Sequence, residues 1–219
     1  MDAVVFDMDG VIFDSERLVI ECWKPIAEKY HIPDIEAACY ECMGINATLT
    51  EQKMKARYGE EFPYQEYKAE VSAAFFEKTK DGKLPQKEGV KELLLYLKEH
   101  HIKTALASST RREVVVRELK EGGLYEYFDV IVCGDMVSKS KPDPEIFLKA
   151  CSLLQVLPKE AYAIEDSYNG IRSAHGAGMM PIMVVDLAPA NEEMKELTTE
   201  IFDSLLQVKS YFEESSCFA

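Results

Sequence analysis

The sequence has no long uninterrupted run of apolar residues, although 47% of its 219 residues are hydrophobic. A helix that crosses a bilayer needs about 18 such residues in succession. The apolar stretch near the start is short and runs into Asp7, Asp9 and Gly10, unlike the longer apolar core of a secretory signal. We therefore expect a cytoplasmic protein that does not associate with membranes.

Positive charge is also scarce. The chain has 25 lysines and arginines against 39 aspartates and glutamates, which gives a net charge of -14. This charge repels the phosphate backbone of a nucleic acid, so we expect no nucleic-acid partner. A phosphorylated small molecule meets the same repulsion. A site for one therefore needs a bound cation and at least one well-placed lysine or arginine.

The cysteines do not form a recognisable framework of disulfides or metal ligands. They are scattered along the chain, at Cys22, Cys39, Cys42, Cys133, Cys151 and Cys217. A chain of this length buries a core without disulfide bonds, so we expect reduced thiols. Cys39 and Cys42 form a C-x-x-C, but no second pair or nearby histidine completes four zinc ligands, and we interpret both as ordinary helix residues. For the assembly, a monomer is the default expectation.

Short apolar runs rich in β-branched residues recur and alternate with helical patterns. The runs lie at Ala3–Phe6, Thr104–Ala107, Val130–Cys133, Tyr162–Ile164, Ile182–Val185 and, more weakly, Glu200–Phe202. The helical patterns between them lie at Val90–His100, Glu113–Glu121, Glu145–Gln155 and Tyr168–Ala177. Strands that alternate with helices predict an α/β fold, in which helices cover both faces of a parallel sheet.

The interval between the first two runs is too long for one crossover helix. About 95 residues separate them, where a single helix with short loops needs far fewer. The excess is expected to form helices at Glu16–Tyr30, Ile35–Met43, Thr48–Tyr58 and Tyr64–Thr79. We therefore predict an all-helical domain over residues 15–82, inserted into a sheet domain of residues 1–14 and 83–219. Two adjacent chain crossings would form a hinge, and both a moving lid and a rigidly packed subdomain are open.

Charged and hydroxyl side chains follow four of the predicted strands at the point where each ends. In a parallel sheet, ligands bind beyond the carboxyl ends of the strands. In chain order these ends carry Asp7 and Asp9, then the hydroxyl cluster 108–110, then the lysine-containing segment 138–144, then Glu165 and Asp166. We expect these side chains to meet at one edge of the sheet.

Four carboxylates at one edge repel one another unless a cation lies among them. They are Asp7, Asp9, Glu165 and Asp166. Oxygen ligands with no histidine or cysteine close by in sequence favour Mg²⁺. We therefore predict a magnesium site formed by all four residues. For Glu165, direct coordination and a hydrogen-bonding role behind the ligands are both open.

Asp7 and Asp9 are two residues apart, so their side chains project to the same side of an extended segment. We predict that Asp7 attacks phosphorus, while Asp9 protonates the leaving oxygen and later activates water. Gly10 then allows the chain to turn away from the site.

Ser108 and Lys141 are the predicted phosphate-binding side chains. Ser108 ends a strand just before a helix and can donate to phosphoryl oxygens together with backbone N–H groups. Lys141 supplies positive charge to the transferring phosphoryl group. Lys139 competes for this role, and Lys141 is preferred because Pro142 restricts its backbone.

Four segments resemble, in order, the motifs of the haloacid dehalogenase-like hydrolase superfamily: residues 7–12, the cluster at Ser108, residues 141–144 and the Glu165-Asp166 pair. The helical insertion after the first strand is similar to that of the β-phosphoglucomutase-like group. The resemblance implies a Rossmann-like core, a helical cap and an aspartyl-phosphate intermediate on Asp7. Dehalogenases of the superfamily lack an acid two residues after the nucleophile, so Asp9 indicates phosphoryl transfer.

Two features of the mutases in that group are missing from the sequence. The mutases carry a histidine in the first cap helix, which helps gate the acid/base residue, and a cap arginine that clamps a second phosphate. Here Glu16–Tyr30 contains no histidine and Gly44–Thr48 contains no arginine. We therefore predict a Mg²⁺-dependent phosphatase of a small phosphorylated metabolite such as a sugar phosphate. The alternatives are a sugar-phosphate mutase and a non-catalytic protein that binds a phosphorylated ligand.

Overall fold

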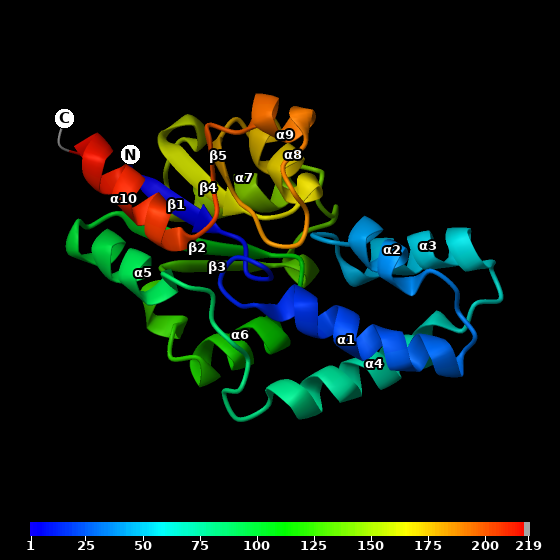
Figure 1. Ribbon diagram of the computed structural model, residues 1–219. Helices are drawn as coiled ribbons and strands as arrows, with labels where there is room; N and C mark the ends of the chain where they lie inside the picture. The colour runs from blue at the N-terminus through cyan, green and yellow to red at the C-terminus, as the bar shows by residue number, and fades with distance from the viewer. Residues whose placement is uncertain (217–219) are drawn as a thin grey trace.

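The computed structural model describes residues 1–216 and shows a parallel sheet with a helical insertion to one side of it (Figure 1). The six strands follow the order β3-β2-β1-β4-β5-β6, and every neighbouring pair is parallel. The strands are β1 (Ala3–Phe6), β2 (Lys103–Ser108), β3 (Val130–Cys133), β4 (Ala161–Glu165), β5 (Met180–Val184) and β6 (Glu200–Phe202). Because β1 lies between β2 and β4, the carboxyl ends of these three strands are adjacent.

Helices cover both faces of the sheet. They are α5 (Val90–Glu99), α6 (Arg112–Glu121), α7 (Glu145–Leu154), α8 (Tyr168–Gly176), α9 (Glu192–Leu197) and α10 (Leu205–Ser216). One apolar core joins α5, α6 and α10 to one face, and a second joins α7 and α8 to the other, with α9 against α8. The predicted α/β fold, with helices on both faces and inserted helices after the first strand, is confirmed.

Two helices near the end of the chain, α9 and α10, are missing from the sequence prediction. At six residues α9 is too short for its apolar period to be informative. The second helix does carry a helical signal, because Leu205, Val208 and Phe212 recur at a spacing of three and four residues and are all buried. That spacing was sufficient to predict α10.

The inserted helices pack around an apolar core of their own. They are α1 (Ser15–Lys29), α2 (Ile35–Glu41), α3 (Ala47–Tyr58) and α4 (Tyr64–Thr79). Helices α1 and α4 lie side by side (Figure 1), and the buried Tyr67 hydroxyl donates to the Trp23 carbonyl at 2.9 Å. The third helix begins before the predicted Thr48, because the Asn46 side chain accepts the Leu49 N–H and caps the helix.

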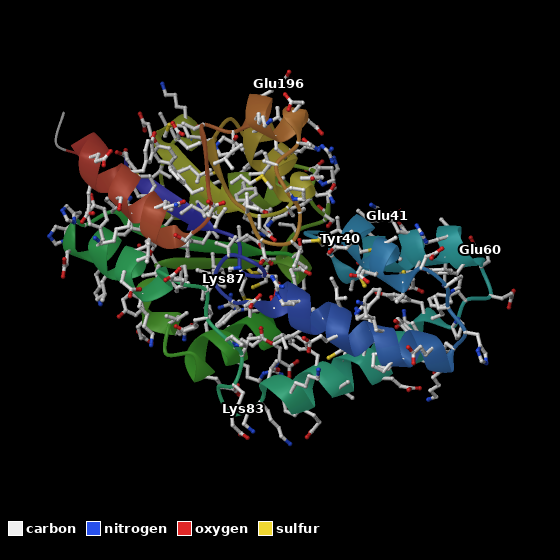
Figure 2. All side chains as sticks on the ribbon, in the orientation of Figure 1. Tyr40, Glu41, Glu60, Lys83, Lys87 and Glu196 are labelled. Carbon is white, nitrogen blue, oxygen red and sulfur yellow. The ribbon has the colours of Figure 1, made fainter. Side chains whose placement is uncertain are left out.

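The two chain crossings between insertion and sheet lie against each other. Phe13 and Gln86 form an isolated antiparallel bridge, and the Lys87 N–H donates to the Ile12 carbonyl at 3.0 Å. The Lys87 ammonium also binds Asp186 at 2.7 Å, and Figure 2 shows Lys87 near this junction. The insertion is therefore joined to the sheet by a paired, hydrogen-bonded connection.

The five cysteines among the described residues are free thiols, and Cys217 lies outside them. Cys39 lies in α2 and Cys42 directly follows that helix. Within residues 1–216, no helix is both long and apolar enough to cross a membrane.

Candidate active site

Lys141 joins three segments at the carboxyl edge of the sheet. Its ammonium donates to Asp7 Oδ1 at 2.5 Å, to Glu165 Oε1 at 2.7 Å and to the Ala107 carbonyl at 3.0 Å. All of its donors are used by groups that follow or end β1, β2 and β4, and its side chain is fully buried. The lysine therefore holds the three central strand ends together as a buried, charged hydrogen-bond network.

The second carboxylate oxygen of Glu165 organises the loop that follows β4. Glu165 Oε2 accepts from the backbone N–H groups of Asp166 and Ser167 and from the Ser167 hydroxyl, each at 3.0 Å. A Cβ on Gly170 would lie 1.7 Å from Oε1, so a glycine is needed beside this carboxylate. These contacts favour the hydrogen-bonding role among the two that the sequence left open for Glu165.

Three buried carboxylates lie close enough to share a cation. Oxygen atoms of Asp7, Glu165 and Asp166 lie within 4.8 Å of one another. Asp166 Oδ2 is buried and has no hydrogen-bond partner in the described part of the chain. Gly10 adopts a φ of +77°, and a Cβ there would lie 2.2 Å from this oxygen. An unpartnered buried oxygen among all-oxygen ligands fits a hard divalent cation.

Asp9 was predicted as one of four magnesium ligands, but its carboxylate lies apart from the other three. Within residues 1–216, the carboxylates close enough to share an ion are the three above, and Asp9 is outside that group. Its oxygens accept hydrogen bonds instead, from the Ser15 hydroxyl at 2.6 Å and the Thr110 hydroxyl at 3.1 Å. These hydroxyls hold the Asp9 side chain at the lining of the adjacent cavity. This position favours an acid/base role over direct coordination by the side chain.

The two competing lysines have different environments. Lys139 is exposed and pairs with Asp143 at 3.2 Å, whereas Lys141 is buried against Asp7. The structure therefore places Lys141, and not Lys139, next to the predicted nucleophile. The peptide bond from Lys141 to Pro142 is cis.

The hydroxyl cluster after β2 divides into one buried and two cavity-lining residues. Ser108 is fully buried, and its hydroxyl accepts the Thr110 N–H at 3.1 Å. Ser109 and Thr110 line the cavity, and the Ser109 hydroxyl also donates to the Gly44 carbonyl at 2.8 Å. The sequence prediction named Ser108 alone, because the strand end was visible and the orientation of the following loop was not.

A cavity of about 570 Å³ opens from Asp7 and Asp9 between the sheet and the inserted helices. This volume suits a small ligand. Besides the predicted residues, its lining includes side chains that the sequence motifs do not mark. Those with charge are Glu16, Lys68, Arg111, Arg117, Glu118 and Asp135, and apolar ones include Val19, Trp23, Val71 and Phe75. The α1 face at the cavity offered a weak signal, since Glu16, Val19 and Trp23 are three and four residues apart.

Comparison with known protein families shows which family the chain belongs to. The model of the haloacid dehalogenase-like hydrolases matches residues 4–184, which include every predicted site residue. The chain belongs to this family. Within it, the inserted helices after β1 place the chain in the β-phosphoglucomutase-like subgroup, as the sequence resemblance predicts.

Relatives of known identity agree with this assignment. The chain is 35% identical to the phosphorylated carbohydrates phosphatase of Thermotoga maritima over 82% of each chain. It is 34% identical to the β-phosphoglucomutase of Bacillus subtilis, over 84% of this chain and 83% of that one. The crystal structure of CbbY from Rhodobacter sphaeroides in complex with phosphate superimposes with a TM-score of 0.79, at 25% identity over 95% of this chain and 96% of that one. The protein is a haloacid dehalogenase-like phosphohydrolase.

The electrostatics of this hydrolase site leave negative charge in excess. Burial raises the pKa of Asp7 to about 8, with Lys141 opposing the shift and Glu165 adding to it. Burial likewise raises the pKa of Asp9 and of Asp166. Burial lowers the pKa of Lys141, but Asp7 and Glu165 outweigh this and raise it above its ordinary value. The lysine stays charged, and the carboxylates need further positive charge to ionise together.

Glu118 should make the stability of the protein depend on pH. This carboxyl is 5% exposed, and burial raises its pKa to about 8, with Asp9 adding and Arg117 opposing. Because the folded-state pKa lies above that of the unfolded chain, the folded state keeps a proton that the unfolded chain releases, and stability falls as pH rises from about 4.5 to about 8. In thermal unfolding, we expect the Tm of Glu118→Gln to fall less than the Tm of the wild type when the pH is raised from about 5 to about 8.5.

A matched control for this measurement is Glu113→Gln, on the exposed start of the same helix. It should follow the wild-type pH dependence. Identical curves for the wild type and Glu118→Gln would contradict the assignment of a raised pKa to Glu118.

Proposed function

We propose that the protein is a Mg²⁺-dependent phosphatase that hydrolyses a small phosphorylated metabolite such as a sugar phosphate, through an aspartyl-phosphate on Asp7. The observation that carries this proposal is the contact between buried Lys141 and Asp7, which lines the cavity together with Asp9. A carboxylate nucleophile, a fixed positive charge and a second acid are thus combined at one end of a ligand-sized space.

In the first half-reaction, a carboxylate oxygen of Asp7 attacks phosphorus. A bond forms between that oxygen and phosphorus, and the bond from phosphorus to the leaving oxygen breaks. Asp9 gives its proton to the leaving oxygen. Burial raises the pKa of Asp9, which favours the protonated form that this transfer needs. The alcohol product then leaves through the cavity.

In the second half-reaction, the Asp9 carboxylate takes a proton from a water molecule. The water oxygen bonds to phosphorus, the bond from phosphorus to Asp7 breaks, and inorganic phosphate forms with both aspartates restored. Lys141 remains charged throughout and stabilises the oxygen of Asp7 as it attacks and as it leaves. Ser109 and Thr110 line the same cavity, where the Thr110 hydroxyl holds Asp9 and the Ser109 hydroxyl donates to the Gly44 carbonyl of the inserted part.

Asp7 and Asp166 are the residues proposed to hold the magnesium ion, with Glu165 fixing the loop behind them. When bound, the ion supplies positive charge that polarises the phosphoryl group and screens the approach of a carboxylate to it. The unpartnered oxygen of Asp166 supports this assignment. The side chain of Asp9 is left to its acid/base role by its two hydroxyl donors.

Residues 15–82 are proposed to act as a cap over this site, on a core of residues 1–14 and 83–219. The cap supplies the cavity wall from α1 and α4, and its connection to the core is the paired crossing at Phe13 and Gln86. A wall from one unit and a nucleophile from the other would allow substrate entry on opening and exclude water on closing.

The cavity lining favours hydrolysis over mutase chemistry. Among the described residues, α1 contributes Glu16, Val19 and Trp23 to the cavity, and none of these is a histidine. The cap loop contributes residues 44–48 without an arginine. A mutase must keep water from its phosphorylated aspartate and must hold a second phosphate. Neither the histidine nor the arginine that the mutases carry for gating and for clamping is present in these two segments.

The proposal is tested by measuring phosphate release from a panel of phosphomonoesters with Mg²⁺. We expect turnover of small phosphorylated metabolites, with sugar phosphates among them. Interconversion of sugar-phosphate isomers without net phosphate release would assign the protein to the mutases instead. Tight binding of phosphorylated compounds without turnover would favour a binding protein.

Magnesium should stabilise the fold as well as support turnover. A ligand at about 100 times its Kd that binds only the folded state stabilises it by about 2.7 kcal/mol. We expect Mg²⁺ to raise the Tm in thermal unfolding and EDTA to reverse the rise and stop phosphate release. Asp166→Asn should remove most of the Mg²⁺-dependent rise, because it weakens the cation site.

The matched control is Glu196→Gln, which removes one negative charge from exposed α9, away from the inserted helices (Figure 2). It should keep the full response to Mg²⁺. A Tm rise that is equal in the wild type and Asp166→Asn would place the ion elsewhere.

A further inference from the structure

The connection between α2 and α3, residues 42–46, is bound to the loops at the carboxyl edge of the sheet. Three side chains of the sheet part form hydrogen bonds with its backbone. The Asn46 N–H donates to the Ser140 hydroxyl at 2.8 Å, the Ser109 hydroxyl donates to the Gly44 carbonyl at 2.8 Å, and the Asn169 amide donates to the Met43 carbonyl at 3.1 Å. Three different loops of the sheet part thus hold one short backbone segment of the inserted helices.

The contact is close enough to exclude a side chain at Gly44. This residue adopts a φ of +73°, and a Cβ there would lie 2.2 Å from the Ser167 Oγ. Met43 and Ile45, on either side of it, are buried. The α2–α3 connection is therefore packed against the sheet part by its backbone, and not only through long side chains that can follow a movement.

Each of the three anchoring side chains lies within two residues, along the chain, of a residue that orders the active site. The pairs are Ser109 with Thr110, Ser140 with Lys141, and Asn169 with Ser167. The second members of these pairs hold Asp9, Asp7 and Glu165. The buried network that fixes the carboxylates of the site therefore also fixes the loops that carry the anchoring side chains.

The same connection forms part of the cavity wall. Residues 44–46 line the cavity together with Asp7 and Asp9. Asn46 also caps α3, because its side chain accepts the Leu49 N–H at 3.0 Å. A movement of the connection away from the sheet part would therefore shift the start of α3 and open this wall.

We infer that Ser109, Ser140 and Asn169 are positioning residues, which seat the α2–α3 connection on the assembled active site and so keep the cavity wall closed beside a bound substrate. Their role in turnover rests on the proposed phosphatase function, whereas the attachment itself does not. Because they hold one short segment, the three hydrogen bonds act as a unit, and loosening one of them loosens the others.

Hydrogen exchange of the Asn46 amide tests the attachment without any substrate. Ser140→Ala removes the acceptor of this amide, and Asn169→Ala removes a donor at the other end of the connection. Loss of one hydrogen bond lowers the ratio of attached to detached forms by about five-fold. We expect the Asn46 amide to exchange faster by about this factor in both variants.

Asn169→Ala gives the decisive result, because it leaves the hydrogen bond between Asn46 and Ser140 in place. Faster exchange of the Asn46 amide in this variant requires that the contacts are coupled. An unchanged rate would mean that they are independent surface contacts, and it would overturn the inference.

The role in turnover is tested by kcat/KM for two compounds. One is acetyl phosphate, whose leaving group is small, and the other is the most rapidly hydrolysed sugar phosphate of the panel. We expect Ser140→Ala and Asn169→Ala each to lower kcat/KM for the sugar phosphate about five-fold, and for acetyl phosphate by less than about two-fold. The difference arises because a small leaving group gains little from the closed wall.

Tyr168→Phe is the matched control. It removes one hydrogen bond from the same turn of α8, to the Pro189 carbonyl at 2.6 Å, and leaves the α2–α3 connection untouched. It should match the wild type in both measurements.

Equal losses on the two compounds in Ser140→Ala and Asn169→Ala would indicate damage to the site itself and would overturn the positioning role. If the wild type hydrolyses neither compound, the proposed phosphatase function is wrong, and the exchange of the Asn46 amide still decides the attachment.

Discussion

We expect Asp7→Asn to abolish phosphate release while the protein stays folded. The proposed nucleophile is a carboxylate oxygen, and an amide oxygen is too weak a nucleophile to replace it. A loss of at least about 1,000-fold in kcat follows from removal of a covalent catalyst. The amide still accepts a hydrogen bond from Lys141, which keeps Glu165 as its charged partner.

The same substitution should cost little stability. Burial raises the pKa of Asp7 to about 8, which means that the ionised carboxylate is unfavourable in the folded state without a cation. A neutral amide avoids this cost, so we expect the Tm in EDTA to stay within a few degrees of the wild type. Both quantities are measured on one preparation, by phosphate release and by thermal unfolding.

Asp2→Asn is a suitable comparison, because Asp2 is exposed just before the same strand. It should have wild-type activity. Asp7→Asn with more than a small fraction of wild-type turnover would remove Asp7 from the role of nucleophile, and the aspartyl-phosphate mechanism with it.

Lys141→Met should be the most destabilising single substitution at the site. It leaves Asp7 and Glu165 buried without their shared counter-charge, and breaking a buried ion pair in this way costs about 3–5 kcal/mol. For a chain of this size that corresponds to a fall in Tm on the order of 10 °C. Phosphate release should be lost as well, because the positive charge beside the nucleophile is gone.

The pH dependence of this loss has a definite sign. Without Lys141 the pKa of Asp7 rises further, because the opposing charge is removed. A raised folded-state pKa means that stability falls as pH rises, so the difference in Tm between the variant and the wild type should be larger at about pH 8.5 than at about pH 5.5.

A double variant separates stability from catalysis. Glu165→Gln in the Lys141→Met background removes one of the two uncompensated charges, so part of the lost Tm should return while phosphate release stays absent. If Lys141→Met alone unfolds with a wild-type Tm at both pH values, the buried network does not have the structural role assigned to it here.

The grouping of Asp7, Lys141, Glu165 and Asp166 could be predicted because each follows a short apolar run at the end of a strand or shortly after it. In a parallel sheet all such ends lie at one edge, so the order of motifs in the chain is enough to bring them together. Of the two competing lysines, the preferred Lys141 is the one that lies beside Asp7. The inserted helices were predicted from the length of one interval, since a crossover needs far fewer residues.

Other parts of the site depend on contacts that no local pattern encodes. The hydroxyls of Ser15 and Thr110 take both oxygens of Asp9, and they come from segments on either side of the insertion. Glu165 turned out to organise its own loop, because three donors converge on one of its oxygens. Neither arrangement follows from the spacing of residues along the chain.

Local patterns were enough to predict the fold class. They were also enough to predict that carboxylate, hydroxyl and lysine residues gather at one edge of the sheet. Strand and helix periods, and the residues directly after each strand, are set by neighbours in the chain. Tertiary packing decided which oxygen of Asp166 lacks a partner and which side chains wall the cavity. These features join residues far apart in sequence, and their energies arise only when burial removes water from charged groups.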